Sequence, residues 1–153
     1  MALRIAEGGL DDPRVVALLE THVARARAET AVGSAHALDV SGLKRPEIRF
    51  WTVLDDGGPL GTAALRRIDA THGEVKSMFV ADAARRTGAG SAVLRHLLAE
   101  AKIMGLARVS LETGSWAYFA PARAFYTAHG FVACGPFEGY GPDPNSVFMT
   151  RAL

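Results

Sequence analysis

The chain has 153 residues, a length that fits one domain with a single buried core. Apolar residues make up 49% of the sequence and charged residues 22%, a balance that excludes the disordered, collagen-like and coiled-coil classes. The 17 Lys and Arg residues nearly match the 16 Asp and Glu residues, so the chain lacks the positive field that attracts nucleic acid. We therefore expect no nucleic-acid partner.

Several further features favour a cytoplasmic location. Polar or glycine residues interrupt every apolar stretch well before the ~20 residues that a membrane-spanning helix needs. The first residues lack the apolar core of a secretory signal, and a single cysteine, Cys134, allows no internal disulfide. No repeat or linker divides the chain, so residues 1–153 are expected to form one domain without membrane contact.

The first half of the chain predicts one helix and then three antiparallel strands. A short strand at residues 3–5 precedes Asp12-Pro13, which is typical of a helix start, and apolar residues then recur at helical spacing up to residue 26. Residues 30–46 are expected to form a loop with a short helix. Residues 48–54 and 60–68 flank a DDGGP turn and predict a hairpin, and residues 74–80 predict a third strand.

In that third strand, strict alternation places Val75, Ser77 and Phe79 on one face of the sheet. The other face would then carry the side chains of Glu74, Lys76, Met78 and Val80.

The second half alternates helices and strands. Residues 88–104 form an amphipathic helix that Gly105 ends, and a second helix is expected at residues 121–129. Strands are expected at residues 108–112, 131–134 and 147–150. The order predicts a mixed, mostly antiparallel α/β sheet with helices on its faces.

A glycine turn at the start of the long helix suggests a phosphate site. Arg85-x-x-Gly88-x-Gly90 follows a strand and opens the helix, where unpaired N–H groups and the helix dipole attract phosphate. A Walker loop would need a lysine after Gly90, but Ser91 follows it. A dinucleotide fingerprint would need a third glycine, but Val93 stands at that position. Glycines at a helix start can also be simple loop residues.

What remains resembles motif A of the GNAT (Gcn5-related) N-acetyltransferases, which hold the pyrophosphate of acetyl-CoA in such a turn. The family's later motif is matched by Ala122, Tyr126 and the Gly130-Phe131 pair, and the order of elements follows the GNAT order. The segments HAL, PEIRFW, GEVKSM, SLETGS and YGPDPNSVFMTRAL are most similar to a subgroup of small bacterial members, the YsnE-like proteins.

The resemblance implies a sheet of about seven strands with about four helices, splayed between the strand that ends at Val80 and the strand that contains Glu112. Acetyl-CoA would be the co-substrate, no metal would be needed, and the acetyl group would pass directly to a primary amine. The predicted coenzyme-binding residues are Met78, Phe79, Val80, Arg85, Arg86, Thr87, Gly88, Ala89, Gly90 and Ser91.

The resemblance also suggests the catalytic residues. Glu74 lies eleven residues before Arg85, the separation of a catalytic glutamate in one branch of the family, and it is the first candidate for the general base. A solvated strand carboxylate paired with Lys76 or His72 is the alternative. Tyr126 matches the tyrosine that protonates the leaving thiolate, with aromatic packing as the alternative.

The acceptor side is less defined. Glu112 could be a competing base or an amine-binding carboxylate, and His36 and Trp116 are weaker candidates for substrate contact. A small-molecule amine fits the neutral charge of the chain better than a basic protein tail does.

Two other functions remain open at this point: a non-catalytic acyl-CoA sensor and an interaction module without a coenzyme. A homodimer is also possible if the C-terminal strand, with its VFM sequence, pairs across a two-fold axis.

Overall fold

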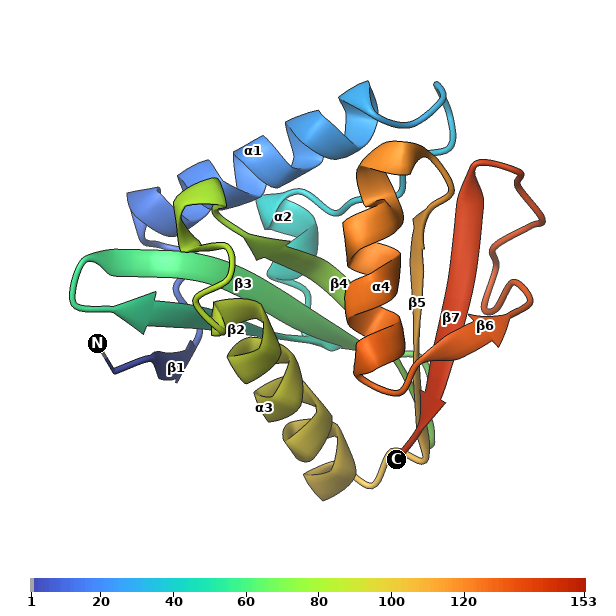
Figure 1. Ribbon diagram of the computed structural model, residues 1–153. Helices are drawn as coiled ribbons and strands as arrows, with labels where there is room; N and C mark the ends of the chain where they lie inside the picture. Colours follow the sequence, from blue (N-terminus) through green and yellow to red (C-terminus); the bar gives the residue numbers. More distant parts are fainter. Residues whose placement is uncertain (1) are drawn as a thin grey trace.

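The computed structural model describes residues 2–153, which form one seven-stranded sheet with helices on both faces (Figure 1). The strands lie in the order β1-β2-β3-β4-β5-β7-β6, and among them only β4 and β5 pair in parallel. This arrangement confirms the predicted mixed, mostly antiparallel fold. The strands are β1 (Arg4–Glu7), β2 (Ile48–Asp55), β3 (Gly58–Arg67), β4 (His72–Val80), β5 (Arg108–Gly114), β6 (Val132–Cys134) and β7 (Ser146–Ala152).

Four helices and two 3₁₀ turns connect the strands: α1 (Pro13–Ala28), α2 (Val40–Leu43), η1 (Asp82–Ala84), α3 (Ala89–Ile103), η2 (Ala117–Phe119) and α4 (Ala120–Ala128). The helix start at Asp12 is confirmed, because the Asp12 carboxylate accepts a hydrogen bond from the backbone N–H of Arg14 at 2.9 Å. Gly105 follows α3 with a φ of 81°, a left-handed conformation that suits glycine. No helix in the described residues is long and apolar enough to span a membrane.

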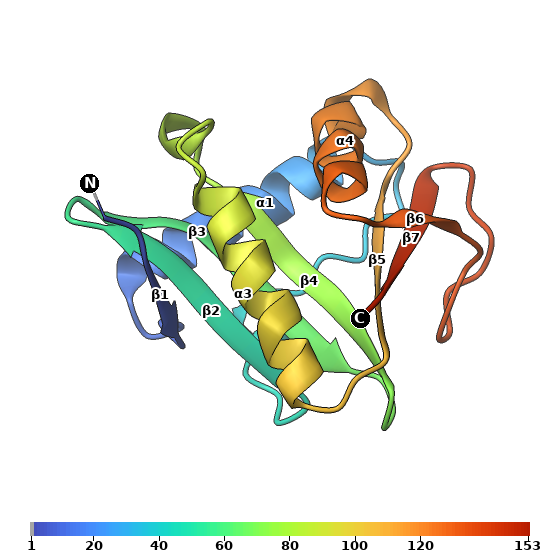
Figure 2. The ribbon, with the colours of Figure 1, turned by 60° about the horizontal axis from the view of Figure 1, so that its bottom comes forward.

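The sheet separates two apolar layers. On one face, Val93 and Leu97 of α3 pack against Trp51, Leu65 and other buried residues of the sheet, and α4 extends this layer. On the opposite face, α1 and α2 pack on the sheet through a smaller cluster. Figure 2 shows α3 crossing in front of β2, β3 and β4, while α1 lies behind them. Each leucine fully buried in these layers contributes about 1.5–3 kcal/mol to folding.

A bulge in β4 makes the predicted facing of this strand wrong beyond Ser77. Ser77 has a φ of 51°, and the register between β3 and β4 shifts at this point. One extra residue in β4 reverses the alternation. As a result Met78 and Val80 pack on the α3 layer together with Val75, whereas Phe79 turns to α1.

The sheet opens between its two parallel strands. β4 and β5 are paired only where His72, Gly73 and Glu74 lie beside residues 108–110. Beyond these pairs the strands spread apart toward their C-terminal ends, as Figure 2 shows. This is the splay that the family resemblance implies, and within residues 2–153 no strand pairs with the end of β4 on that side.

The suggested pairing of the VFM segment with a second copy is wrong. β7 contains this segment, but it lies between β5 and β6 and pairs with both. Its Phe148 and Met149 side chains are buried within the chain. The outer strand at this end of the sheet is β6 instead.

Candidate functional site

The split between β4 and β5 leads into a cavity of about 750 Å³. The turn before α3 and the start of α4 line one half, and the loop after α1 lines the other, together with the end of β5 and the start of β7. Most of the predicted site residues, which the sequence spreads from His36 to Tyr126, line this one space.

The glycine turn forms one end of the cavity. Arg86 and Gly88 have φ angles of 65° and 87°, so the chain makes a tight left-handed turn before α3 begins. The backbone N–H groups of Gly90 and Ser91 belong to the first turn of this helix, where no carbonyl of the helix can accept from them. Arg85, Arg86, Gly88, Ala89, Gly90 and Ser91 all line the cavity.

Thr87 differs from the other residues of this turn because it is absent from the cavity lining. Its hydroxyl donates to the carbonyl of Ala84 at 2.5 Å and accepts from the N–H of Ala89 at 3.3 Å. Thr87 therefore stabilises the turn through these hydrogen bonds, outside the cavity lining. Gly90 is in close contact with its surroundings, since a Cβ atom there would lie 3.3 Å from Val80 and 3.5 Å from the ring of Phe125.

The end of β4 forms the wall beside this turn. Met78, Phe79 and Val80 line the cavity, as predicted. Ser77 lines it too, and its buried hydroxyl has no hydrogen-bond partner within residues 2–153. On the α1 side, the His22 ring lies 5.3 Å from that of Phe79. Burial, together with the charge of Lys76, lowers the pKa of His22 to about 4, so this imidazole is neutral at pH 7.

Tyr126 lies in the cavity wall on α4 and is almost fully buried. Its ring packs edge-on against Phe125 at 5.5 Å and Phe131 at 5.7 Å, so the aromatic packing role is real. The cavity position and the packing are compatible. Burial raises the pKa of Tyr126 well above its usual range, which keeps the phenol protonated.

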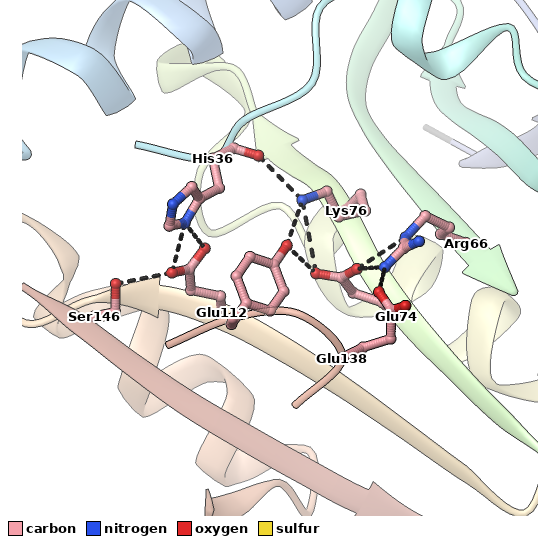
Figure 3. A network of polar contacts seen from close by, with 8 residues as sticks. His36, Arg66, Glu74, Lys76, Glu112, Glu138 and Ser146 are labelled. Carbon is pink, nitrogen blue, oxygen red and sulfur yellow. Dashed lines mark hydrogen bonds and ion pairs between the residues drawn. The ribbon is translucent and has the colours of Figure 1, made fainter. Parts of the chain in front are cut away.

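Glu74 lies at the centre of a buried polar network, shown in Figure 3. It lines the cavity, yet its residue is 0% exposed. One carboxylate oxygen lies 3.0 Å from the guanidinium of Arg66. The other accepts a hydrogen bond from Tyr140 at 2.7 Å and lies 3.6 Å from Lys76 Nζ. The alternative of a solvated carboxylate is wrong, although the pairing with Lys76 is present.

Sequence reasoning missed Tyr140 and assigned no role to Arg66. Tyr140 lies in a loop of glycine and proline residues that carries no periodic signal. Burial, together with the Glu74 charge, raises the pKa of Tyr140, so it remains a donor to that carboxylate. Lys76 Nζ donates to the Tyr140 hydroxyl and to the backbone carbonyl of His36, both at 3.1 Å.

His36 and Glu112 come together in the half of the cavity that the loop after α1 lines (Figure 3). His36 Nδ1 lies 2.6 Å and 2.8 Å from the two carboxylate oxygens of Glu112. Ser146 Oγ also donates to Glu112 at 2.8 Å. The sequence named both residues as acceptor-side candidates but gave no sign of this pairing, because they are 76 positions apart.

Trp116 is not brought to this site. It is absent from the cavity lining, and its residue is 41% exposed. Its indole N–H donates to Asn145 Oδ1 at 3.0 Å. Within residues 2–153 no group of three or more His, Cys, Asp or Glu side chains is arranged to hold a metal ion.

Comparison with known proteins shows the family of this chain. Residues 16–131 match the Acetyltransferase (GNAT) family. The uncharacterized N-acetyltransferase YsnE of Bacillus subtilis is 44% identical over 140 residues, which cover 92% of this chain and 93% of YsnE. The uncharacterized N-acetyltransferase YedL of Escherichia coli is 40% identical over 144 residues, which cover 94% of this chain and 91% of YedL.

A solved structure from Klebsiella pneumoniae, assigned as an acyl-CoA N-acyltransferase, matches with a TM-score of 0.83 and 26% identity. The match covers 99% of this chain and 97% of that one. With the family match, the two relatives and this fold in agreement, the chain belongs to the GNAT family and is an N-acetyltransferase.

Proposed function

We propose that this protein transfers the acetyl group of acetyl-CoA directly to the primary amine of a small molecule. One observation carries the proposal: a single cavity joins the glycine turn of α3 to a polar chamber that contains Glu74 and the His36–Glu112 pair. A coenzyme bound at the turn and an amine bound in the chamber would therefore meet beside the end of β4.

The residues at the turn fit the coenzyme. The unpaired N–H groups of Gly90 and Ser91 would bind the diphosphate, with the N–H groups of Arg86 and Gly88 beside them and the side chains of Arg85 and Arg86 adding positive charge. The unpaired edge of β4 at Met78 to Val80 would pair with the pantetheine amides as an added strand would. The Ser77 hydroxyl, buried without a partner among residues 2–153, is available to a ligand at this place.

Two proton transfers accompany the reaction. The amine must lose a proton before or during its attack on the thioester, and the departing thiolate must gain one. Tyr126 suits the second transfer because it is a protonated phenol in the cavity wall. For the first transfer the chamber supplies two candidates, Glu74 and the His36–Glu112 pair. Glu74 is paired with cations, whereas Glu112 is paired with an imidazole.

The preference for a small amine comes from the enclosed position of the chamber. Glu74 is 0% exposed, and the side chain of Glu112 is 10% exposed, so an acceptor must enter the cavity to reach either carboxylate. Negative side chains in such a place suit a cationic amine. A cytoplasmic location and a homodimer remain parts of this proposal.

Acetyl-CoA and a panel of amino acids, polyamines and aminoglycosides test the proposal directly, with free thiol release as the readout. We expect a rise in melting temperature with acetyl-CoA alone and thiol release with at least one amine. Thermal stabilisation without turnover across the panel would instead support an acyl-CoA sensor. No stabilisation at all would contradict the coenzyme site.

A further inference from the structure

We infer that His36 is the group that accepts the proton of the acceptor amine, and that Glu112 positions it for this task. The inference rests on the proposed function, because it assigns one of its two proton transfers. It gives His36 a catalytic role in place of simple substrate contact, and it places the base on the loop after α1 instead of on β4.

The first argument is the geometry of the pair. Glu112 receives Nδ1 of His36 at 2.6 Å, and Ser146 fixes the carboxylate from the other side at 2.8 Å. A carboxylate is an acceptor, so the hydrogen of a neutral imidazole must lie on Nδ1. The lone pair is then on Nε2, which makes no hydrogen bond to any residue between 2 and 153.

The second argument is position. His36 and Glu112 both line the cavity, together with Ser34 and Asn145. The His36 side chain is 36% exposed, whereas the side chain of Glu112 is 10% exposed. The imidazole can therefore touch a bound amine and still pass its proton to water. The carboxylate is held behind it and keeps a fixed orientation.

The third argument is the contrast with Glu74. Both oxygens of Glu74 already have partners: Arg66 at one, and Tyr140 and Lys76 at the other. To accept a proton from a substrate, Glu74 would have to give up one of these contacts in a buried site. His36 needs no such rearrangement. Glu74 is instead the anchor of the network that holds Lys76, and through it the backbone of His36.

The proton balance is simple. An acceptor ammonium gives one proton to His36 Nε2, which releases it to solvent. The neutral amine attacks the thioester carbon, a C–N bond forms and the C–S bond breaks. Tyr126 gives its proton to the thiolate and is reprotonated, through solvent, by the proton that the nitrogen loses. The sum is an amide, free CoA thiol and one proton released to water.

Nitrogen NMR of the histidine rings tests the pair without any acceptor. In the ligand-free wild-type protein at a pH where His36 is neutral, we expect the hydrogen on Nδ1. In Glu112→Gln the same ring should shift toward the Nε2–H form, because the carboxylate no longer binds Nδ1. An Nε2–H ring in the wild-type protein would overturn the inference, whatever the activity.

Kinetics with the best amine of the panel test the role. We expect His36→Gln to lower kcat about 100-fold, with acetyl-CoA affinity unchanged, and Glu112→Gln to lower kcat at least about 10-fold. His96→Gln is the matched control and should keep wild-type kcat, because His96 lies in α3 and is absent from the cavity lining. In His36→Ala, added imidazole should restore part of the activity, which a purely structural loss would not allow.

The outcomes separate the two proposals. A wild-type protein that releases no thiol with any amine contradicts the proposed function and with it the role of His36. A wild-type protein that turns over while His36→Gln retains its kcat overturns only the inference. The inference also fails if imidazole leaves a folded, coenzyme-binding His36→Ala protein inactive.

Discussion

The guanidinium of Arg25, in the last turn of α1, makes two parallel hydrogen bonds of 2.9 Å and 2.8 Å to the carboxylate of Asp82. Asp82 opens η1, the short turn that leads from β4 into the glycine turn. Arg85 Nη2 lies 3.4 Å from the same carboxylate. One aspartate therefore ties a helix on one face of the sheet to the proposed diphosphate site.

Asp82→Asn should weaken coenzyme binding. The amide keeps the size of the carboxylate but loses its charge, so Arg25 and Arg85 are held less firmly and the glycine turn is less ordered before binding. We expect the Kd for CoA, measured by calorimetry, to rise severalfold. Arg27→Ala is the control, since this residue of the same helix makes no hydrogen bond to Asp82 in the described part of the chain. An unchanged Kd for Asp82→Asn would show that the tie does not matter for binding.

The two glycines that flank α3 provide a matched pair of variants. Gly88 and Gly105 have φ angles of 87° and 81°, and an added Cβ would meet nothing within 4 Å at either position. Gly88→Ala and Gly105→Ala should therefore cost similar stability, about 1–2 kcal/mol, from the left-handed backbone alone. We expect only Gly88→Ala to weaken CoA binding, because only this methyl group lies at the glycine turn that lines the cavity. Equal CoA affinities in the two variants would contradict the assignment of the turn.

Tyr126→Phe should separate chemistry from binding. The variant keeps the ring that packs on Phe125 and Phe131 but loses the proton donor. We expect kcat to fall by about 100-fold with little change in CoA affinity or melting temperature. Steady-state kinetics and a calorimetric titration check this result. A variant with full kcat would leave Tyr126 with a packing role alone.

Two glutamates that share Arg66 distinguish a structural role from a catalytic one. Glu74 and Glu138 lie 3.0 Å and 2.7 Å from its guanidinium, but the Glu138 side chain is 44% exposed. Glu74→Gln should lower the free energy of unfolding by about 3–5 kcal/mol, since it leaves the largely buried Lys76 without a carboxylate partner and Arg66 with Glu138 alone. Glu138→Gln should cost less than about 1 kcal/mol. Denaturant titrations measure both values. A Glu74→Gln protein of wild-type stability but without activity would favour Glu74 as the base.

His22 should make stability depend on pH. Its pKa is lowered to about 4 in the folded chain, against about 6.5 when unfolded, so the unfolded state binds the proton more readily between these values. Stability is lost as pH falls from 6.5 toward 4, by about 2 kcal/mol at pH 5. In His22→Phe this contribution disappears, while the carboxylates that respond to acid remain. Equal losses in the two proteins between pH 7 and pH 5 would contradict a buried neutral His22.

Local signals in the sequence were sufficient for most of the fold. The Asp12-Pro13 start of α1, the DDGGP hairpin and the Gly88-to-Gly105 extent of α3 depend on backbone conformations that a few adjacent residues determine. The bulge at Ser77 carries no such signal, because nothing in the letters of β4 marks an inserted residue. Strict alternation therefore placed Phe79 on the wrong face.

The site likewise has a part that local sequence signals predict and a part that they do not. The glycine turn is a local motif, and the spacing of Arg85, Gly88 and Gly90 predicts it directly. The polar half of the cavity consists of contacts between distant segments, such as Tyr140 with Glu74, 66 positions apart, and His36 with Glu112. Such contacts arise from tertiary packing, which periodicity does not record. The sequence could name the carboxylates and the local partner Lys76 of Glu74, but not the distant partners Tyr140 and His36.

The short pairing between β4 and β5 has a mechanical consequence. Three paired positions join a half formed by β1 to β4 to a half formed by β5 to β7, and the two proposed ligands would bind between them. Contacts through the two bound ligands would add to these three pairs and to the apolar core that both halves share, and would join the halves more firmly. Bound substrates would therefore stabilise the junction between the two halves of the sheet as well as react there.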